Sequence, residues 1–400
     1  MKTIVVIGTG YVGLPAAILL AKAGYRVIGV DIDEKIVEAI NNGVLHIDEA
    51  ELQKLMVEPE VRKNLIARKD PCKADIFIIA VPTPLDDRKK ICDMSFVISA
   101  IESIIPYIEK GNLVIVESTI PPLTCQDVIT PMLEKATGLK VGGEILLCHC
   151  PERILPGDIF KEIINNDRII GGVNRESSEA AREIYASFVK GNLYLTDDVT
   201  AELCKLMENT YRDVNIALAN EFAAVAEGLG ISVKEAIELS NKHPRVNILS
   251  PGIGVGGHCI PIDPWFIKEV DPENTTLIMT ARKINDGMPA KIAAKIRKAV
   301  KDIAEPKIVA LGASYKPNTY DLRESPALEV IKMLREDGYD VTHYDPLVEG
   351  MEYNSIEEAA DGADCLVLLV EHSKILNDLE EHKEQVRQKM RGDLILRFYH

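Results

Sequence analysis

The 400-residue sequence predicts an α/β protein with two Rossmann-like, doubly wound domains joined by a central all-helical domain that contains one long helix. Three observations support this fold class. Short β-branched runs alternate with helical patterns near the N-terminus, residues 200–229 contain no proline and fit one helix, and the alternation restarts at residue 306. We therefore expect domains over residues 1–195, 196–300 and 301–400.

Each predicted element follows from a local pattern. Apolar, β-branched runs predict strands at 3–8, 26–31, 75–81, 112–117, 144–149, 307–312, 340–345, 364–370 and 393–398. Helical patterns predict helices at about 11–23, 200–229, 233–240, 275–300 and 325–337. Strands that alternate with helices imply parallel sheets, because each helix carries the chain back to start the next strand.

Composition limits the classes of function. The formal net charge is −16, so we expect no nucleic-acid partner. No apolar stretch reaches the length of about 18 residues needed to span a membrane, and glycines interrupt the N-terminal apolar run, so we expect a cytoplasmic protein without a signal peptide. Cys148 and Cys150 flank His149, but a structural zinc site needs four ligands, so we expect reduced thiols and no metal.

A dinucleotide site is predicted at residues 8–13, where Gly8, Gly10 and Gly13 fit the pattern GxGxxG between a strand and a helix. Glycines permit a tight turn and close approach of a pyrophosphate to the helix N-terminus. Asp31 ends the second strand, where a carboxylate binds ribose hydroxyls and repels a 2′-phosphate, which favours NAD over NADP. The alternative is a glycine-rich turn without a ligand.

Two threonines follow later strands of the same domain. Thr83 and Thr119 are therefore placed to touch the cofactor or the substrate, although taken alone they also fit ordinary turns. At 312–317 the second domain of this kind lacks the second glycine, so the dinucleotide pattern is absent there.

The segment 250–265, SPGIGVGGHCIPIDPW, places a thiol after a run of glycines. Such a loop approaches a ligand closely, and Cys259 at its end could attack a carbonyl. A buried structural thiol is the alternative. His258 adjoins the thiol, but adjacent side chains usually diverge. Asp263 precedes a proline and suits the N-cap of a helix.

Three polar residues share one face of the predicted long helix. Lys205, Asn209 and Arg212 are spaced by four and three residues. They form either a solvated stripe or the wall of a pocket, in which a desolvated lysine can act as a general base. The sequence pattern leaves both interpretations open.

Over nearly its whole length the chain resembles the UDP-glucose/GDP-mannose dehydrogenase family. The segments that carry the resemblance are GTGYVG at 8–13, VPTP at 81–84, EST at 117–119, CPERILPG at 150–157, ELCKLMENTYRDVNIALANE at 202–221, HPRVNILSPGIGVGGHCIPIDPW at 243–265 and SYKPNTYDLRESPA at 314–327. The resemblance implies an NAD-binding first domain, a helical dimerisation domain and a UDP-sugar-binding last domain.

The resemblance also implies a four-electron oxidation of a UDP-sugar at C6, through a thiohemiacetal and a thioester on Cys259. The matching catalytic positions are Cys259, Lys205, Asn209, Asp263, Glu152 and Thr119. The lysine and the asparagine match positions that handle the alkoxide and the oxyanion. The aspartate matches the group assigned to water activation, and the glutamate matches one near the reacting carbon.

Binding residues are implied in the same way. Those expected for the cofactor are Gly8, Gly10, Tyr11, Val12, Gly13, Asp31, Thr83, Thr119 and Arg323. Those expected for the substrate are Arg153, Ile154, Lys205, Asn209, Arg212, His243, Arg245, Gly256, Tyr315 and Lys316. Arginines bind a diphosphate bidentately despite the acidic whole chain. In the family the long helix forms a dimer and the arginine matching Arg245 reaches across it, so we expect a homodimer or a higher homo-oligomer.

The sugar is inferred from a few segments. CPERILPG, TYRDVNIALANE and HPRVN resemble the UDP-N-acetyl-D-mannosamine dehydrogenases of the family, and Ile154 and Leu155 stand where the N-acetylglucosamine enzymes usually have an acidic residue. Pro156 occupies the place of a glutamate of the glucose enzymes, so any role of that glutamate cannot be transferred. UDP-N-acetylglucosamine and UDP-glucose remain alternative substrates. A two-electron hydroxyacid-type dehydrogenase and a non-catalytic NAD-binding protein are the rival classes.

Overall fold

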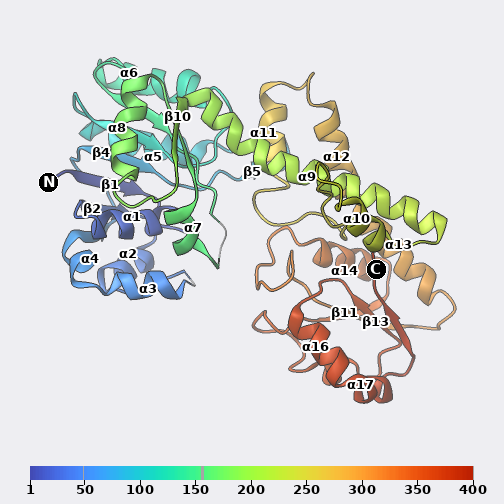
Figure 1. The fold of residues 1–400 in the computed structure, drawn as a ribbon. Helices are drawn as coiled ribbons and strands as arrows, with labels where there is room; N and C mark the ends of the chain where they lie inside the picture. The colour runs from blue at the N-terminus through green and yellow to red at the C-terminus, as the bar shows by residue number, and fades with distance from the viewer. Residues whose placement is uncertain (48, 155–156, 400) are drawn as a thin grey trace. The chain divides into compact units, whose positions relative to one another are not determined.

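The computed structural model describes residues 1–47, 49–154 and 157–399 (Figure 1). The predicted fold class is confirmed, since an α/β domain at each end of the chain is connected by helices. Leu155 and Pro156, on which part of the substrate prediction depends, lie outside the described residues.

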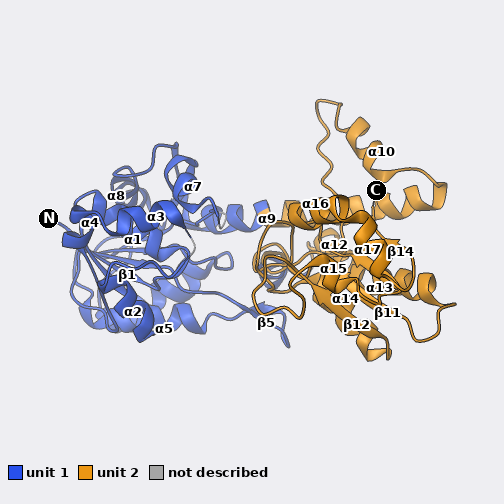
Figure 2. Cartoon of the chain, turned by 90° about the horizontal axis from the view of Figure 1, so that it is seen from below, with its two compact units in different colours: residues 1–208, 265–272 blue, residues 209–264, 273–400 orange. Residues whose placement is uncertain are grey.

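The chain divides into two compact units, coloured separately in Figure 2. The first contains residues 1–208 and 265–272, and the second contains residues 209–264 and 273–400. Each unit is built around a sheet of its own. The central helices are shared between the units, so each unit is described by itself.

In its described part, the first unit contains an eight-stranded sheet. Its spatial order is β10 (Leu193–Asp197), β9 (Arg168–Gly172), β8 (Leu146–His149), β7 (Leu113–Val116), β4 (Ile76–Ile79), β1 (Thr3–Ile7), β2 (Arg26–Val30) and β3 (Leu65–Arg68). The chain runs outward from β1 to β3 and then returns to β4 on the other side of β1. In doubly wound sheets ligands bind where the strand order reverses, which here is at the carboxyl ends of β1 and β4.

The expectation of a wholly parallel sheet was wrong at one edge. Strand β9 pairs antiparallel with β8, and β10 is parallel to β9. Neither strand was predicted, nor was β3. An antiparallel strand at the edge of a parallel sheet is common, because only the inner strands need crossover helices on both faces.

The side chains of β1 alternate between two cores, as a strand covered on both faces requires. Ile4 and Val6 pack with the face formed by α1 (Gly13–Lys22), α3 (Ala50–Met56), α7 (Ile159–Asn165) and α8 (Arg175–Tyr185). Val5 and Ile7 pack with the opposite face, which includes α5 (Ser95–Ile104) and α6 (Thr130–Thr137). All four strand residues are buried.

The second unit repeats this plan on a smaller scale. Its parallel sheet has the order β12 (Asp340–Tyr344), β11 (Lys307–Leu311), β13 (Cys365–Leu368) and β14 (Leu394–Leu396). One face is covered by α13 (Met288–Val300) and α14 (Pro326–Glu336). The other is covered by α15 (Ile356–Ala359), α16 (Ser373–Glu381) and α17 (Lys383–Lys389).

The central helices begin with α9 (Asp198–Leu229), which matches the predicted long helix closely. After α10 (Val233–Ser240) and α11 (Asp263–Val270), the stretch expected at about 275–300 is two helices, α12 (Thr276–Asp286) and α13. The break falls at Gly287, followed by a proline in the first turn of α13, which cannot donate a hydrogen bond to the preceding helix. No helix in the described ranges is long and apolar enough to cross a membrane.

Candidate active site

The glycine turn after β1 is fixed by close backbone contacts. Gly8 has φ +87°, and a Cβ there would lie 2.6 Å from the carbonyl oxygen of Ala80. A Cβ on Gly13 would lie 1.9 Å from the carbonyl oxygen of Gly8. A Cβ on Gly10, in contrast, would meet nothing within 4 Å. The middle glycine therefore leaves open space beside the start of α1, where a pyrophosphate can approach the backbone.

Asp31 follows β2 and is held against this turn. Its Oδ2 accepts hydrogen bonds from the backbone N–H and the hydroxyl of Thr9, each at 3.0 Å. Its Oδ1 accepts one from the backbone N–H of Asp33 at 3.1 Å. The carboxylate is only half-buried, so lone pairs remain for the hydroxyls of a ribose. These residues fit an NAD adenosine ribose at the end of β2.

The two predicted threonines follow strands on the same side of the crevice. Thr83 comes after β4 and is buried, and Thr119 comes after β7 and is half-buried. Because β1, β4 and β7 are parallel neighbours, the carboxyl ends that precede these residues share one edge of the sheet. Tyr11 is 39% exposed in the glycine turn, and Val12 directly precedes α1. The residues expected for the cofactor in the first unit are thus gathered at one edge.

A buried ionic cluster lies beside Glu152 and was not predicted. The guanidinium of Arg168, at the start of β9, forms ion pairs with the carboxylates of Glu152 and Glu117 and lies over the ring of Tyr185 at 4.5 Å. The hydroxyl of Tyr185 donates to Glu117 at 2.6 Å. Burial raises the pKa of Glu117 to about 7. Glu152 is therefore held in place by a charge, although no sequence pattern links it to Arg168.

The polar face of α9 is partly buried. Lys205 is 7% exposed and Asn209 is 8% exposed, whereas Arg212 is exposed. A solvated stripe is therefore excluded for the first two residues. The amide Nδ2 of Asn209 donates to Oδ2 of Asp263 at 2.6 Å, and this carboxylate is also buried. Two predicted catalytic residues are thus in direct contact.

Among the cysteines in the described residues, Cys259 alone is exposed, which argues against a buried structural thiol. Its carbonyl oxygen accepts hydrogen bonds from the backbone N–H of Ile262 at 3.1 Å and of Asp263 at 2.9 Å. Cys259 therefore lies one turn before α11. Asp263 stands at the start of this helix, and its side chain accepts a hydrogen bond from Asn209.

The glycines before Cys259 are required by packing against the segment that follows β11. A Cβ on Gly256 would lie 2.3 Å from the carbonyl oxygen of Glu324. Gly257 has φ +85°, donates its N–H to the carbonyl of Arg323 at 3.0 Å, and lies against the ring of Tyr315. Gly256 therefore has a structural reason to be glycine, in addition to any contact with substrate.

The other residues expected to bind the substrate lie in both units. In the first unit Arg153 forms an ion pair with Glu208 at 2.7 Å, and Ile154 packs at the edge of the core. In the second unit His243 and Arg245 are exposed after α10, and the Nζ of Lys316 lies 5.5 Å from the ring of Tyr315. Arg323, expected at the cofactor, pairs with Asp321 at 2.6 Å.

The predicted catalytic residues are divided between the two units. Thr119, Glu152 and Lys205 belong to the first unit. Asn209, Cys259 and Asp263 belong to the second. Lys205 and Asn209 stand one turn apart on α9, so the division runs through a single helix. Within the described part of the chain, no group of three or more His, Cys, Asp or Glu side chains is arranged to hold a metal ion.

A Rossmann domain with an open glycine turn, followed by an exposed cysteine and a second α/β domain, is typical of a nucleotide-dependent enzyme. Models of the UDP-glucose/GDP-mannose dehydrogenase family match the chain along most of its length. They are the NAD binding domain at residues 2–189, the central domain at 199–287 and the UDP binding domain at 309–396. The chain belongs to this family, and the predictions of a dehydrogenase and of NAD are confirmed.

Similar proteins cover the chain almost completely. A UDP-N-acetyl-D-mannosamine dehydrogenase from Methanocaldococcus jannaschii is 51% identical, over 99% of this chain and 91% of that protein. One from Methanococcus vannielii is 49% identical, over 99% and 92%. The solved structure of the UDP-D-ManNAc dehydrogenase from Pyrococcus horikoshii superimposes with a TM-score of 0.92 at 42% identity, over 98% of this chain and 94% of that one.

Proposed function

We propose that this protein oxidises C6 of UDP-N-acetyl-D-mannosamine from the alcohol to the carboxylate, with Cys259 as covalent nucleophile. The observation that carries the proposal is the exposed residue Cys259, which ends a glycine loop one turn before α11. Asp263, at the start of that helix, is hydrogen-bonded to the buried Asn209. The names of the similar dehydrogenases support the choice of sugar. The proposal also includes the three predicted domains. Residues 1–195 bind NAD, residues 196–300 form the dimer, and residues 301–400 bind the UDP-sugar.

The glycine turn and Asp31 would hold NAD, which would supply the acceptor for a hydride from the sugar carbon, and two such transfers would account for the four electrons. The first oxidation leaves an aldehyde, and the sulfur of Cys259 adds to its carbon as a thiohemiacetal. The second oxidation leaves a thioester. Water then breaks the carbon–sulfur bond, so that the carboxylate leaves and the thiol is regenerated. The covalent trap keeps the aldehyde from escaping between the two oxidations.

The buried polar groups supply proton transfer and oxyanion stabilisation in this proposal. Lys205 accepts the proton of the alcohol as it is oxidised, and the Asn209 amide donates to the oxyanion of each tetrahedral intermediate. Asp263 activates the water that cleaves the thioester. The 2.6 Å hydrogen bond from Asn209 to Asp263 supports these roles, because it orients both side chains. Glu152 and Thr119 complete the proposed catalytic set.

A homodimer is part of the proposal. Helix α9 carries an exposed apolar stripe at spacings of three, four and seven residues, formed by Met207, Tyr211, Leu218, Phe222, Val225 and Leu229. A contiguous apolar face on a long helix is typical of an interface between subunits. Arg245, exposed after α10, is available to reach a second subunit. We also propose a cytoplasmic location, where an exposed thiol stays reduced.

The test is to count NADH per UDP-sugar by absorbance, using UDP-N-acetylmannosamine, UDP-N-acetylglucosamine and UDP-glucose. We expect two NADH per molecule and a preference for the mannosamine sugar. Cys259→Ser should lose turnover and still bind NAD, because the serine hydroxyl is a much weaker nucleophile. Cys72→Ser, which changes a half-buried cysteine of the first unit, is the matched control.

Each part of the proposed function has its own contradicting result. One NADH per substrate would favour a two-electron hydroxyacid-type enzyme. Full turnover by Cys259→Ser would exclude the thioester scheme. Preference for UDP-glucose or UDP-N-acetylglucosamine would overturn the choice of sugar and leave the chemistry intact. Absence of turnover with every sugar, despite NAD binding, would favour a non-catalytic role.

A further inference from the structure

The segment between β11 and α14, residues 312–325, carries the groups proposed to hold the nucleotide. Tyr315 and Lys316 lie near its start, and Arg323 lies near its end. The hydroxyl of Ser325 donates to the carbonyl of Ala313 at 2.7 Å, which ties the end of the loop to its start. Since Gly257 donates to Arg323, the position of this loop also bears on the segment that leads to Cys259.

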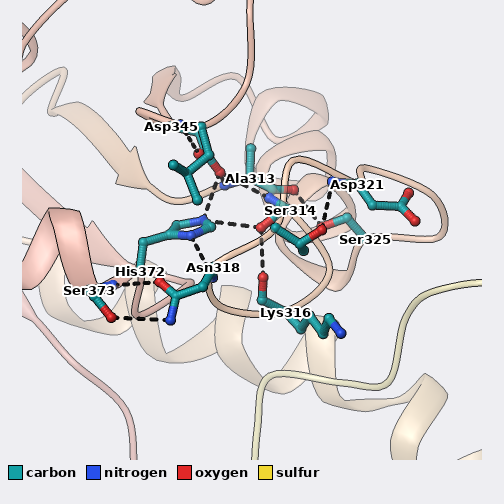
Figure 3. Close-up of polar contacts among 11 residues, drawn as sticks. Ala313, Ser314, Lys316, Asn318, Asp321, Ser325, Asp345, His372 and Ser373 are labelled. Carbon is teal, nitrogen blue, oxygen red and sulfur yellow. Dashed lines mark hydrogen bonds and ion pairs between the residues drawn. The ribbon is translucent and has the colours of Figure 1, made fainter. Parts of the chain in front are cut away.

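A buried polar network lies beneath this loop (Figure 3). Ser314 and His372 are completely buried, and Asp345 is 1% exposed. Oδ2 of Asp345 accepts hydrogen bonds from the backbone N–H groups of Ala313 at 2.8 Å and Ser314 at 3.2 Å, and lies 3.0 Å from Nε2 of His372. Oδ1 accepts from the backbone N–H of Leu347 at 3.0 Å. Both carboxylate oxygens are therefore used within the protein.

An aspartate follows the second strand in both units, but its surroundings differ between them. Asp31 and Asp345 each follow the second strand of their unit, and each accepts hydrogen bonds from the turn after the first strand. Asp31 remains half-buried and can take a ribose, whereas Asp345 is enclosed. Burial alone would raise the pKa of Asp345, but the hydrogen bonds from His372, Ala313 and Leu347 hold it below its usual range. The second unit therefore uses this carboxylate to build the loop.

The hydrogen bonds define the tautomer of His372. The backbone N–H of Asn318 donates to Nδ1 at 2.9 Å, so Nδ1 carries a lone pair. The proton is then on Nε2, which faces Asp345 at 3.0 Å and the hydroxyl of Ser314 at 3.1 Å. The Ser314 hydroxyl in turn donates to the carbonyl of Lys316 at 2.9 Å. The imidazole ring thus links the Asp345 carboxylate to both ends of the turn at 314–318.

A second attachment joins the same turn to the start of α16. Asn318 has φ +60°, and its side chain accepts from the backbone N–H of Ser373 at 2.9 Å and donates to the hydroxyl of Ser373 at 3.1 Å. Asparagine is one of the few non-glycine residues that adopt this conformation readily. The turn that carries Tyr315 and Lys316 is therefore fastened to the residues 372–373 at two adjacent points.

We propose that His372 is a positioning residue for the nucleotide, because its Nδ1 holds the 314–318 turn in the conformation that presents Tyr315 and Lys316 to UDP. This inference rests on the proposed function in that it takes the loop to bind the uridine nucleotide. His372 touches no substrate in this proposal and acts through Asn318 and Ser314.

Two substitutions test the two ring nitrogens of His372 separately. His372→Asn places an amide oxygen near the position of Nδ1 and can still accept from Asn318. His372→Gln places its amide N–H near the position of Nε2 and keeps only the contact with Asp345. We expect His372→Gln to weaken UDP binding, measured by calorimetry, about tenfold or more, and to raise KM for the UDP-sugar equally with kcat nearly unchanged. His372→Asn should restore both values to within about threefold of wild type.

Hydrogen exchange reports the loop independently of turnover. Amides of the segment 312–325 should exchange faster in His372→Gln than in wild type or His372→Asn, while the glycine turn of the first unit is unchanged. His382→Gln is the matched control. The Nδ1 of His382 pairs with Glu357 at the protein surface, at 3.0 Å. A cooperative thermal unfolding transition, together with NAD binding, confirms that every variant has folded.

The outcomes separate the two proposals. Wild-type affinity for UDP in His372→Gln would overturn the inference, as would equal losses in both variants without faster exchange of the loop. If the wild-type protein binds UDP and the variants behave as expected, but no UDP-sugar is oxidised, the proposed function fails and the positioning role stands. If the wild-type protein does not bind UDP, the positioning role is overturned.

Discussion

Alanine substitution at each glycine of the 8–13 turn distinguishes residues required for folding from the residue required for the cofactor. Gly8→Ala and Gly13→Ala should destabilise the protein, because a Cβ would lie 2.6 Å and 1.9 Å from carbonyl oxygens. Gly10→Ala should fold normally, because a Cβ there meets nothing within 4 Å. That Cβ would instead occupy the space reserved for the pyrophosphate, so NAD binding should be lost.

The magnitudes follow from the backbone geometry. At Gly8 the φ of +87° costs an L-residue about 1–2 kcal/mol, and relief of the contact with Ala80 costs about 1–3 kcal/mol more. The free energy of unfolding should therefore fall by about 2–5 kcal/mol, and Tm by roughly 5–15 °C. At Gly10 the free energy of unfolding should change by less than about 0.5 kcal/mol. The Kd for NAD should rise at least about tenfold, or ~1.4 kcal/mol.

The assay combines thermal unfolding, with and without NAD, and calorimetric titration of NAD. NAD at a fixed concentration should raise the Tm of the wild-type protein by mass action and should raise the Tm of Gly10→Ala less. Gly8→Ala and Gly13→Ala should unfold at lower temperature even without NAD. Wild-type affinity for NAD in Gly10→Ala, or a loss of stability equal to that of Gly8→Ala, would refute the distinction.

Three further predictions concern the cores and the apolar face of α9. Burial raises the pKa of Glu117 to about 7, so the contribution of this group to the free energy of unfolding is fully present below its usual pKa of 4.5 and is lost as pH rises through 7. In urea unfolding between pH 4.5 and 8, Glu117→Gln should therefore lose roughly 3 kcal/mol less than the wild-type protein, and an equal dependence on pH would contradict the burial argument. Arg282→Met leaves the buried carboxylate of Asp213 without its ion pair and should lower the free energy of unfolding by about 3–5 kcal/mol in a urea titration, so a loss under about 1 kcal/mol would count against it. Val225→Glu places a charge on the apolar stripe and should give monomers in light scattering with NAD binding intact; a persistent dimer would exclude that face as the interface.

The elements that the sequence predicts well are those with strong apolar runs or long periodic patterns. Each of the nine predicted strands was found, and both of its ends lie within two residues of the predicted ends. Helix α9 begins two residues before its predicted start. Strands β3 and β10 were missed because they alternate or stay partly exposed at the sheet edges, as LIAR and LYLTD show. Strand β9 was missed as well, since its RIIGG run ends in glycines typical of loops.

The site was predictable where a motif is local. The GxGxxG turn, Asp31 and the glycines before Cys259 are each recognisable within a few residues of sequence. The contact between Asn209 and Asp263 joins positions 54 residues apart, and the pairing of Glu152 with Arg168 depends on an antiparallel edge strand that had no clear pattern. The network of His372 and Asp345 was invisible for the same reason, because an isolated histidine carries no sign of its partner.

The enclosed Asp345 also bears on how this fold can be redesigned. The second unit already has the carboxylate and Gly312, which shares with Gly8 a φ of +87°. What differs is that Nε2 of His372 lies 3.0 Å from Oδ2 of Asp345, so this carboxylate is already bound within the protein. Conversion to a second cofactor site would therefore require removal of a partner rather than addition of a ligand, and would sacrifice the order of the neighbouring loop.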